Sequence, residues 1–504
     1  MFGRHMAIAD VTSSKTFCPQ KRRRFVLIAA ILASAMGFID GSVVAIAMPS
    51  LMSDMNALIH DAIWINNGYL LPLSALILVG GALGDVYGQR RSFIGGILVF
   101  VIASIFCAIA PSTDVLIISR VVQGVGAAIM VPGSLAILAK AYPKEERGAA
   151  IGKWAAASAV TTALGPLLGG VVLQSLGDSA WRLIFAINLP IGAVALFLLW
   201  KMVPPDVAEK KKTPDWIGAL LISAALLALA YGLAAPEGGE GGGLPSLEQI
   251  VVFVGVAIGA LGAFIWWESR TRSPMVPLRL FASSTFSGAN VLTFSLYFGL
   301  SAVLFFLPVT LIDGWSIPQG QVALVFLPIS IAIGLLSSHV GKLADRYGPG
   351  SIIASGSLLV AISYGMMVLL ADYQSYWLSV MPFMILSAIG MAGVVSPLSA
   401  AVMTSVDDDN TGTASGVNNA VSRVAGLLAV ALMGLLAAGT YNSVPGADIG
   451  NFGLTESATD AVIHSNAMTE AYQSVLTVAA LLSLVSALVA WRTIHRAALP
   501  AEDA

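Results

Sequence analysis

The sequence predicts an all-α polytopic membrane protein with fourteen transmembrane helices. Of its 504 residues, 57% are hydrophobic and only 11% are charged, whereas soluble domains carry about 25% charged residues. Fourteen apolar segments are long enough, or nearly so, to cross a hydrocarbon core of about 30 Å, which takes roughly 17–25 helical residues. Lys and Arg residues gather in alternate turns between these segments. Together these features exclude a soluble globular class.

We expect the first span to remain in the mature chain, although a basic region precedes it. Its apolar run is about twice as long as a secretory signal core of roughly 7–15 residues, and it contains Asp40. The other thirteen follow in order. The predicted spans lie near residues 25–47, 62–83, 93–110, 115–139, 149–173, 183–200, 216–235, 247–267, 286–312, 320–341, 351–371, 376–402, 413–439 and 471–491.

The distribution of Lys and Arg predicts that both chain ends are cytoplasmic, because short cytoplasmic loops are enriched in these residues. If the basic N-terminal tail 1–24 is cytoplasmic, every second turn and the C-terminal tail 496–504 are cytoplasmic as well. The opposite turns carry Arg182, and segments 236–246 and 440–470 contain no Lys or Arg. The basic turns hold Arg90 and Arg91; Lys140, Lys144 and Arg147; Lys201 and Lys210 to Lys212; Arg270, Arg272 and Arg279; Lys342 and Arg346; and Arg492 and Arg496.

An internal repeat indicates a duplicated domain plan. Residues 81–88 and 341–348 share the pattern G-x-L-x-D-x-Y-G, each at the end of one helix and the start of a turn. The copies are eight spans apart, although a duplication of six-helix halves would separate them by six. We therefore expect six-helix bundles at 25–203 and 281–495, with a linker and two inserted helices at 204–280. Parallel repeats of this kind are typical of transporters that rock about a midplane site.

Two of the charges inside predicted spans have opposite sign and similar depth, Asp40 in the first span and Arg120 in the fourth. A lone charge near mid-bilayer costs about 2.5–3.5 kcal/mol on insertion scales, so such residues usually face a partner or water. With a rise of about 1.5 Å per residue, both lie roughly 8 Å below the outer hydrocarbon surface. The pair can therefore meet. Separation or drying of the site would favour a protonated Asp40, which is how a proton switch works; the alternative is a static ion pair between two helices.

The chain resembles the fourteen-helix drug:proton antiporter family of the major facilitator superfamily over nearly its whole length. Residues 40–49 are similar to that family's first-helix motif D-x-T-V-V-N-V-A-L-P, with Ser42 in place of Thr and Ala45 in place of Asn. Residues 120–128 match the fourth-helix motif R-x-x-Q-G-x-G-A-A, and 181–192 are similar to W-R-x-I-F-x-I-N-x-P-x-G. The resemblance implies a major facilitator fold and a role for Asp40 in proton coupling or cation binding.

Two further stretches extend the resemblance. Residues 161–170 resemble G-x-x-x-G-P-x-x-G-G, which marks exporters in the superfamily, with Thr161 in place of the first Gly; ordinary small-residue packing is the alternative. Residues 81–91 and 341–348 resemble the turn that latches the two halves on the cytoplasmic side, although a plain positive-inside turn also explains the arginines. The antiporter motif residues are Gly165, Pro166, Gly169 and Gly170, and the latch residues are Gly81, Asp85, Gly88, Arg90, Arg91, Gly341, Asp345, Arg346 and Gly348.

Several other side chains are candidates for a substrate pocket. Aromatic residues could hold lipophilic cations, although aromatics in membrane helices more often pack or sit at the interface. Arg423 lies about ten residues into its span without an obvious acidic partner, so it could bind an anionic substrate group or pair with Asp40. The pocket candidates are Gln123, Trp64, Tyr69, Asn188, Phe298 and Arg423.

The motifs that are missing limit the function further. The sequence has no phosphate-binding P-loop, no cluster with metal-ligand spacing and no nucleophile–base arrangement. We expect no enzyme activity, cofactor, metal or nucleic acid. The leading hypothesis is proton-coupled export of amphipathic small molecules (multidrug efflux) by alternating access, by a monomer in the lipid bilayer of a bacterial inner membrane. The alternatives are a lipid or metabolite exporter of the same fold, an importer, and a membrane sensor or scaffold without transport.

Overall fold

The computed structural model describes residues 17–206, 214–234, 245–407, 411–447, 452 and 461–494, and all regular structure in them is helical. Each of the fourteen predicted spans coincides with a helical segment. Thirteen of these segments in the described residues are long and apolar enough to cross a membrane, and the fifth, α5, contains the shorter apolar stretch Leu164–Leu176. The prediction of an all-α polytopic membrane fold is therefore confirmed.

The first half of the chain contains six spans, the last of which is broken into short helices. Its elements are α1 (Gln20–Met55), α2 (Ile59–Tyr87), α3 (Gln89–Ala108), α4 (Thr113–Ala141), α5 (Lys144–Leu176), η1 (Asp178–Ala180), α6 (Trp181–Ala186), α7 (Asn188–Phe197) and η2 (Leu198–Met202).

Two apolar helices precede the second half, which again contains six spans. The elements are α8 (Trp216–Ala234), α9 (Leu247–Glu268), η3 (Leu278–Ala282), α10 (Ser284–Val309), η4 (Thr310–Gly314), α11 (Gln319–Ala323), η5 (Leu324–Phe326), α12 (Leu327–Tyr347), α13 (Pro349–Leu370), η6 (Ala371–Tyr373), η7 (Tyr376–Val380), α14 (Met381–Thr404), α15 (Thr411–Ser443) and α16 (Ala461–Thr493).

Helix ends outside the bilayer differ from the sequence prediction. The expected loop 440–470 is shorter, because α15 runs to Ser443 and α16 already begins at Ala461. The early part of α16 is too polar for a hydropathy criterion, yet several of its polar groups have partners in the protein. His464 is hydrogen-bonded to the Tyr441 hydroxyl at 2.7 Å, and Thr469 accepts a hydrogen bond from the Trp315 indole at 2.9 Å.

The internal repeat is also a structural one. Both copies end a helix on a glycine in the left-handed region, Gly88 with φ +93° and Gly348 with φ +89°. Glycine adopts such angles without steric cost, so each copy can turn sharply from one helix into the next, α2 into α3 and α12 into α13.

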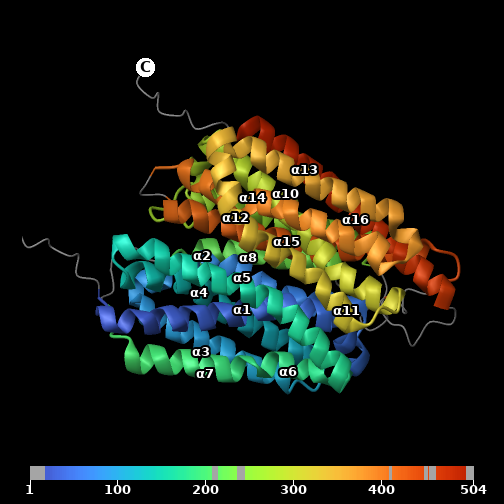
Figure 1. Cartoon of the computed structure of the whole chain (residues 1–504), viewed down its shortest axis with the longest axis horizontal. Helices are drawn as coiled ribbons and strands as arrows, with labels where there is room; N and C mark the ends of the chain where they lie inside the picture. Colours follow the sequence, from blue (N-terminus) through green and yellow to red (C-terminus); the bar gives the residue numbers. More distant parts are fainter. Residues whose placement is uncertain are drawn as a thin grey trace, which may run out of the picture.

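The two halves lie side by side, with α1–α7 in the lower part of Figure 1 and α10 and α12–α16 in the upper part, whereas the short helix α11 reaches down beside α1. The inserted helix α8 packs against both α2 and α15, whereas α9 packs against α8. Leu226 of α8 is buried with Ala75 of α2 and Leu427 of α15. The inserted pair is therefore a lateral element that touches both halves.

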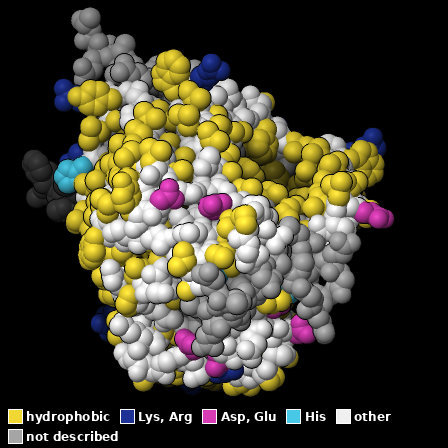
Figure 2. Space-filling model, turned by 90° about the vertical axis from the view of Figure 1, so that its right-hand side faces the viewer, with side chains coloured by type: hydrophobic (Ala, Val, Ile, Leu, Met, Phe, Trp, Pro, Cys, Tyr) yellow, Lys and Arg dark blue, Asp and Glu magenta, His cyan; other side chains and the backbone are white. Residues whose placement is uncertain are grey.

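The first and last described residues lie at the same end of the helices, at the left of Figure 1. We call this end the terminal face and the other end the opposite face. Figure 2 looks onto the opposite face, where hydrophobic side chains form much of the surface and acidic side chains are visible near the middle. Arg182 lies at this end, beside Asp54, with which it forms an ion pair.

Candidate functional site

A buried polar cluster around Asp40 forms the centre of the candidate site. Asp40 of α1 is 0% exposed and Arg120 of α4 is 1% exposed. Arg120 Nη1 lies 2.6 Å from Asp40 Oδ2. The Gln123 amide donates to the other carboxylate oxygen, Asp40 Oδ1, at 2.9 Å. The structure thus brings together the two charges that helical depth predicted to meet, and both carboxylate oxygens are occupied.

Arg120 has additional partners that are independent of Asp40. Its Nη1 donates to Gln123 Oε1 at 2.7 Å, and its Nε donates to the Ile65 carbonyl at 3.3 Å. The guanidinium also lies 4.3 Å from the centre of the Tyr69 ring and 5.6 Å from that of Phe185. Cation–π contacts of this kind stabilise a desolvated cation. The positive charge would therefore keep several partners if Asp40 became neutral.

The cluster extends to two helices that the sequence did not connect with it. Gln123 donates to Ser104 Oγ of α3 at 3.0 Å, and Asn188 of α7 donates to the same oxygen at 3.2 Å. Asn188 Oδ1 is buried without a hydrogen-bond partner. Gln123 and Asn188, predicted as pocket candidates, therefore lie within the polar network, and Ser104 is the residue that links them.

The glycines of the antiporter motif determine how closely α5 approaches α1. A Cβ on Gly165 would lie 2.7 Å from Ser42 Oγ, and one on Gly169 would lie 2.2 Å from Val43 Cγ2. Real Cβ atoms do not approach other atoms below about 3 Å, so a side chain at either position would require Ser42 or Val43 to change rotamer or the two helices to separate. Ser42 and Val43 follow Asp40 closely on α1. The motif therefore fits α5 against the helix that carries the buried carboxylate.

The same motif reaches the other half of the molecule near the opposite face. A Cβ on Gly170 would lie 2.6 Å from Ala323 Cβ and 3.0 Å from the Gln319 carbonyl oxygen of α11. The Gln319 amide also donates to Ser50 Oγ of α1 at 2.5 Å. Nearby, a Cβ on Gly434 of α15 would lie 2.3 Å from Ile63 Cδ1 of α2. The two halves are thus in close contact toward the opposite face.

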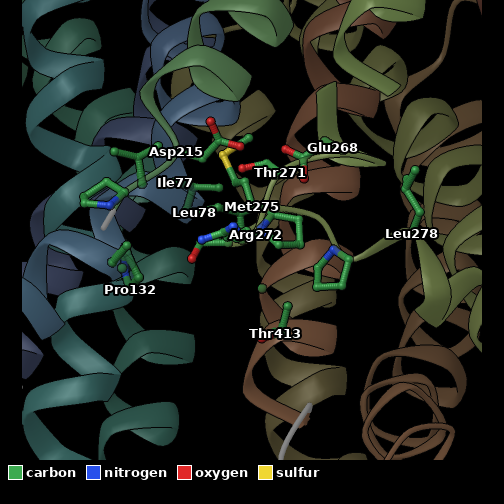
Figure 3. Close-up of a pocket in the computed structure, with 18 of the residues that line it drawn as sticks. Ile77, Leu78, Pro132, Asp215, Glu268, Thr271, Arg272, Met275, Leu278 and Thr413 are labelled. Carbon is green, nitrogen blue, oxygen red and sulfur yellow. The ribbon is translucent and has the colours of Figure 1, made fainter. Parts of the chain in front are cut away.

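Toward the terminal face, a cavity of about 870 Å³ lies between the halves (Figure 3). The first half contributes Ile77, Leu78 and Pro132, and α15 of the second half contributes Thr413 and Asn419. The link from α9 to η3, residues 269–277, covers part of it, together with Asp215 and Glu268. In the described structure, the two halves are therefore in contact toward the opposite face and are separated by a cavity toward the terminal face.

The predicted aromatic pocket is divided among separate places. Tyr69 is buried on Arg120, whereas the Trp64 ring lies 6.1 Å from the Tyr231 ring of α8. Phe298 of α10 lies 5.9 Å from Phe294 within the second half. Arg423 of α15 has a buried Nε without a hydrogen-bond partner. Sequence reasoning found these residues individually but could not place them relative to one another.

The first copy of the latch is anchored by contacts that were not predicted. Asp206 accepts hydrogen bonds from the backbone N–H groups of Gln89 and Arg90, at 2.7 and 3.0 Å, and so satisfies the first turn of α3. The Arg90 side chain donates to the carbonyls of Leu199 and Trp200, both at 2.8 Å. Arg90 therefore ties α3 to the end of the sixth span.

The remaining latch residues are less constrained by described contacts. Arg91 is exposed, and Arg346 lies over the Tyr347 ring at 5.3 Å. A Cβ on Gly81 would lie 4.0 Å from Pro132 Cβ, and one on Gly341 would lie 4.0 Å from Ser396 Oγ, so both positions have ordinary contact room. The side chains of Asp85 and Asp345 lie outside the described part of the structure.

Among the described residues, no group of three or more His, Cys, Asp or Glu side chains is placed to hold a metal ion. The polar cluster instead combines one carboxylate, one guanidinium and two amides. Such a set can bind and release a proton, and it can bind polar groups of an organic molecule.

Comparisons with known proteins agree with this architecture. The sequence pattern that defines the Major Facilitator Superfamily matches residues 30–430. The chain is 32% identical over 426 residues to the tetracenomycin C resistance and export protein of Streptomyces glaucescens, covering 83% of this chain and 76% of that protein. It is 32% identical over 410 residues to the multidrug resistance protein Stp of Mycobacterium tuberculosis (strain ATCC 25618 / H37Rv), covering 81% of this chain and 74% of that protein.

Among solved structures, the fold is similar to that of a bacterial homologue of the human lysosomal transporter Spinster in an inward-facing and unoccupied conformation. The TM-score is 0.66, the sequence identity is 16%, and the similarity covers 94% of this chain and 98% of that one. At this identity the likeness concerns the fold alone.

Proposed function

The chain belongs to the Major Facilitator Superfamily of membrane transporters, and from this premise we propose that it exports amphipathic small molecules in exchange for protons. It is a multi-pass membrane protein of a transporter family and not an enzyme, and its relatives at about 30% identity include drug-resistance and export proteins. Bacterial relatives favour the cell membrane as its location. Substrate class and proton coupling are the parts that we propose.

The buried ion pair supports proton coupling more than any other observation. Asp40 and Arg120 face each other inside the first half, away from lipid and water. When one partner of a buried ion pair loses its charge or moves away, the remaining buried charge destabilises the protein by about 3–5 kcal/mol unless it is neutralised or solvated. Protonation of Asp40 therefore removes the ionic contact between α1 and Arg120, and this change in the contacts of α1 is the linkage that a proton-driven transporter needs.

The chemistry of this step follows from the remaining contacts of Arg120. A proton that binds Asp40 Oδ2 takes the place of the hydrogen bond from Arg120 Nη1. The guanidinium keeps the Ile65 carbonyl, Gln123 Oε1 and the Tyr69 ring as partners. Because these partners are on α2 and α4, α1 is the element that loses a contact when Asp40 is neutral; it keeps only the hydrogen bond from Gln123 to Asp40 Oδ1 in this cluster, and so becomes easier to move.

The location of the cavity gives the direction of access. With the terminal face in the cytoplasm, as the positions of Lys and Arg predict, the halves are closed outside and hollow inside. We therefore assign the described conformation to the inward-facing state, ready to take substrate from the cytoplasm. The division into bundles 25–203 and 281–495 with an inserted pair between them provides the two bodies that would rock in alternating access.

Transport by purified protein in liposomes tests the proposal. An imposed pH gradient should drive fluorescent amphipathic drugs across the membrane in the wild type, and Asp40→Asn should abolish this proton-driven flux. Asp114→Asn is the matched control, since Asp114 is an exposed acid on the same helix as Arg120. A lipid probe that moves while drugs do not would favour a lipid exporter instead. If Asp40→Asn retains proton-driven flux, the coupling role of Asp40 is wrong.

A further inference from the structure

Two carboxyl groups meet at the terminal end of the inserted helices, far in sequence from Asp40. A Cβ on Gly218 of α8 would lie 2.7 Å from Asp215 Oδ2 and 2.8 Å from Glu268 Oε1, so both oxygens converge on the same point. Gly218 leaves the space in which they approach each other. In Figure 3, Asp215 and Glu268 lie at the top of the cavity, with Pro132 to the left and Thr413 below.

The two carboxyl groups are supplied with donors unequally. Asp215 accepts from the Gly218 backbone N–H at 2.8 Å and from the Trp267 indole at 2.9 Å. Glu268 is 3% exposed, and its Oε2 accepts from the Val276 backbone N–H at 3.1 Å. Its second oxygen, Oε1, is buried without a hydrogen-bond partner.

No cation neutralises the pair in the described structure. The other charged side chains that line the cavity, Arg272 and Arg279, come from the link 269–277 and from η3. The ion pairs between described residues include none with Asp215 or Glu268. Two adjacent carboxylates with one oxygen lacking any donor are unfavourable away from water. A single proton on Glu268, donated to Asp215, satisfies both groups.

The geometry points to a second proton-binding site, in which Glu268 and Asp215 share one proton and thereby hold the link across the cavity. Glu268 is the connection between the site and the link, because its other oxygen binds the backbone of Val276. Loss of the shared proton sets two carboxylates against each other. Glu268 then leaves, Val276 loses its acceptor, and the link over the cavity between the halves is released.

This site is separate from the Asp40 cluster and does not depend on the proposed function. At this site, the protonation state of the carboxyl pair would determine whether the inserted helices hold the link over the opening of the cavity at the terminal face. The site also gives a physical reason for an acidic residue at the terminal end of each inserted helix, where the two carboxyl groups face each other. Proton release at this site would change the access to the cavity without any change at Asp40.

Two measurements on the full-length protein test the inference. The first is an infrared difference spectrum between wild type and Glu268→Gln, which should show the loss of one protonated carboxylic C=O band at neutral pH. The second is the mobility of a nitroxide on Ser273→Cys, in the link. Its spectrum should change from immobile to mobile as the pH rises in wild type. In Glu268→Gln it should stay immobile, because the amide still donates to Asp215.

Matched variants give the test its controls. Glu248→Gln changes an acid in the first turn of the same helix α9 and should preserve both the band and the pH-dependent mobility. Asp40→Asn should preserve them as well, even where it abolishes transport, so the two proposals can fail separately. An unchanged carboxylic band in Glu268→Gln would show that Glu268 carries no proton. A link whose mobility is equally pH-dependent in Glu268→Gln would show that another group controls it.

Discussion

Gly170→Ala should shift the protein away from the conformation described here. Gly170 of α5 faces α11 where the halves close toward the opposite face, and a Cβ there would lie 2.6 Å from Ala323 Cβ and 3.0 Å from the Gln319 carbonyl oxygen. Favourable contacts between carbon atoms lie at about 3.5–4.0 Å, so the two helices would have to separate by roughly 1 Å. The added methyl group therefore opposes closure at this end.

The size of the effect follows from the packing. Overpacking by one methyl group costs about 1–3 kcal/mol, and this cost applies only while the halves are closed at Gly170. The gain in helix propensity on replacing Gly by Ala, about 1 kcal/mol, applies to both conformations and cancels. A difference of about 1–3 kcal/mol changes a two-state equilibrium by roughly 5- to 150-fold. We therefore expect a population shift toward a state open at the opposite face.

Spin labels across this end would measure the shift. Cysteines at Leu176 and Tyr373, which are 64% and 67% exposed, report on the first and second half in a background without the native cysteines. Gly170→Ala should increase the population with the longer distance. Gly152→Ala is the control on the same helix, because a Cβ there meets nothing within 4 Å. Identical distance distributions in wild type and Gly170→Ala would refute the reasoning.

Three further predictions concern stability and reactivity. Arg120→Gln should lower the melting temperature more than Asp40→Asn. An unpaired buried charge destabilises a protein by about 3–5 kcal/mol; Asp40 would be left without its cation in the first variant, whereas Arg120 keeps other partners in the second. The reverse order of melting temperatures would contradict this account. Asp206→Ala should lower the free energy of unfolding by about 1–2 kcal/mol, as loss of a helix cap does. Replacement of the exposed Arg91 by Ala should change it by no more than about 0.5 kcal/mol; thermal unfolding of both variants measures the difference. Burial raises the pKa of the Cys18 thiol, against the smaller opposing effect of nearby arginines. The thiolate therefore forms at higher pH than in the unfolded chain, so labelling of native Cys18 should lag behind that of denatured protein until the pH exceeds the raised value.

The spans could be predicted because a bilayer imposes length and hydrophobicity on every helix that crosses it. The meeting of Asp40 and Arg120 was also predictable, since helical rise fixes the depth of each side chain independently of the rest of the fold. Helix ends beyond the hydrocarbon obey no such rule. The start of α16 at Ala461 depends on partners such as Tyr441 for His464, which only the folded structure supplies.

The polar network was predictable only in part. Ser104 links Gln123 and Asn188, but its hydroxyl also donates to the Phe100 carbonyl of its own helix at 2.8 Å. A serine in an apolar helix usually makes that local bond, so the sequence carries no sign of a second role. The carbonyls that bind Arg90, in Leu199 and Trp200, are equally invisible, because every residue has one and only tertiary packing selects these.

The order of contacts along α1 and α5 explains why glycines in the fifth span are useful to a proton-driven exporter. Ser42 and Val43 follow Asp40 on α1 and touch α5 at Gly165 and Gly169, where no methyl group fits. At Gly165 the backbone of α1 is also close, because Ile39 Cα lies 3.3 Å from the position of an added Cβ, so little space is left between the two helices. In the proposed mechanism, a shift of α1 after protonation of Asp40 would therefore displace α5 as well. The next residue, Gly170, is the point where α5 contacts α11 of the second half. A movement of α5 would therefore act directly on the contact that closes the two halves against each other.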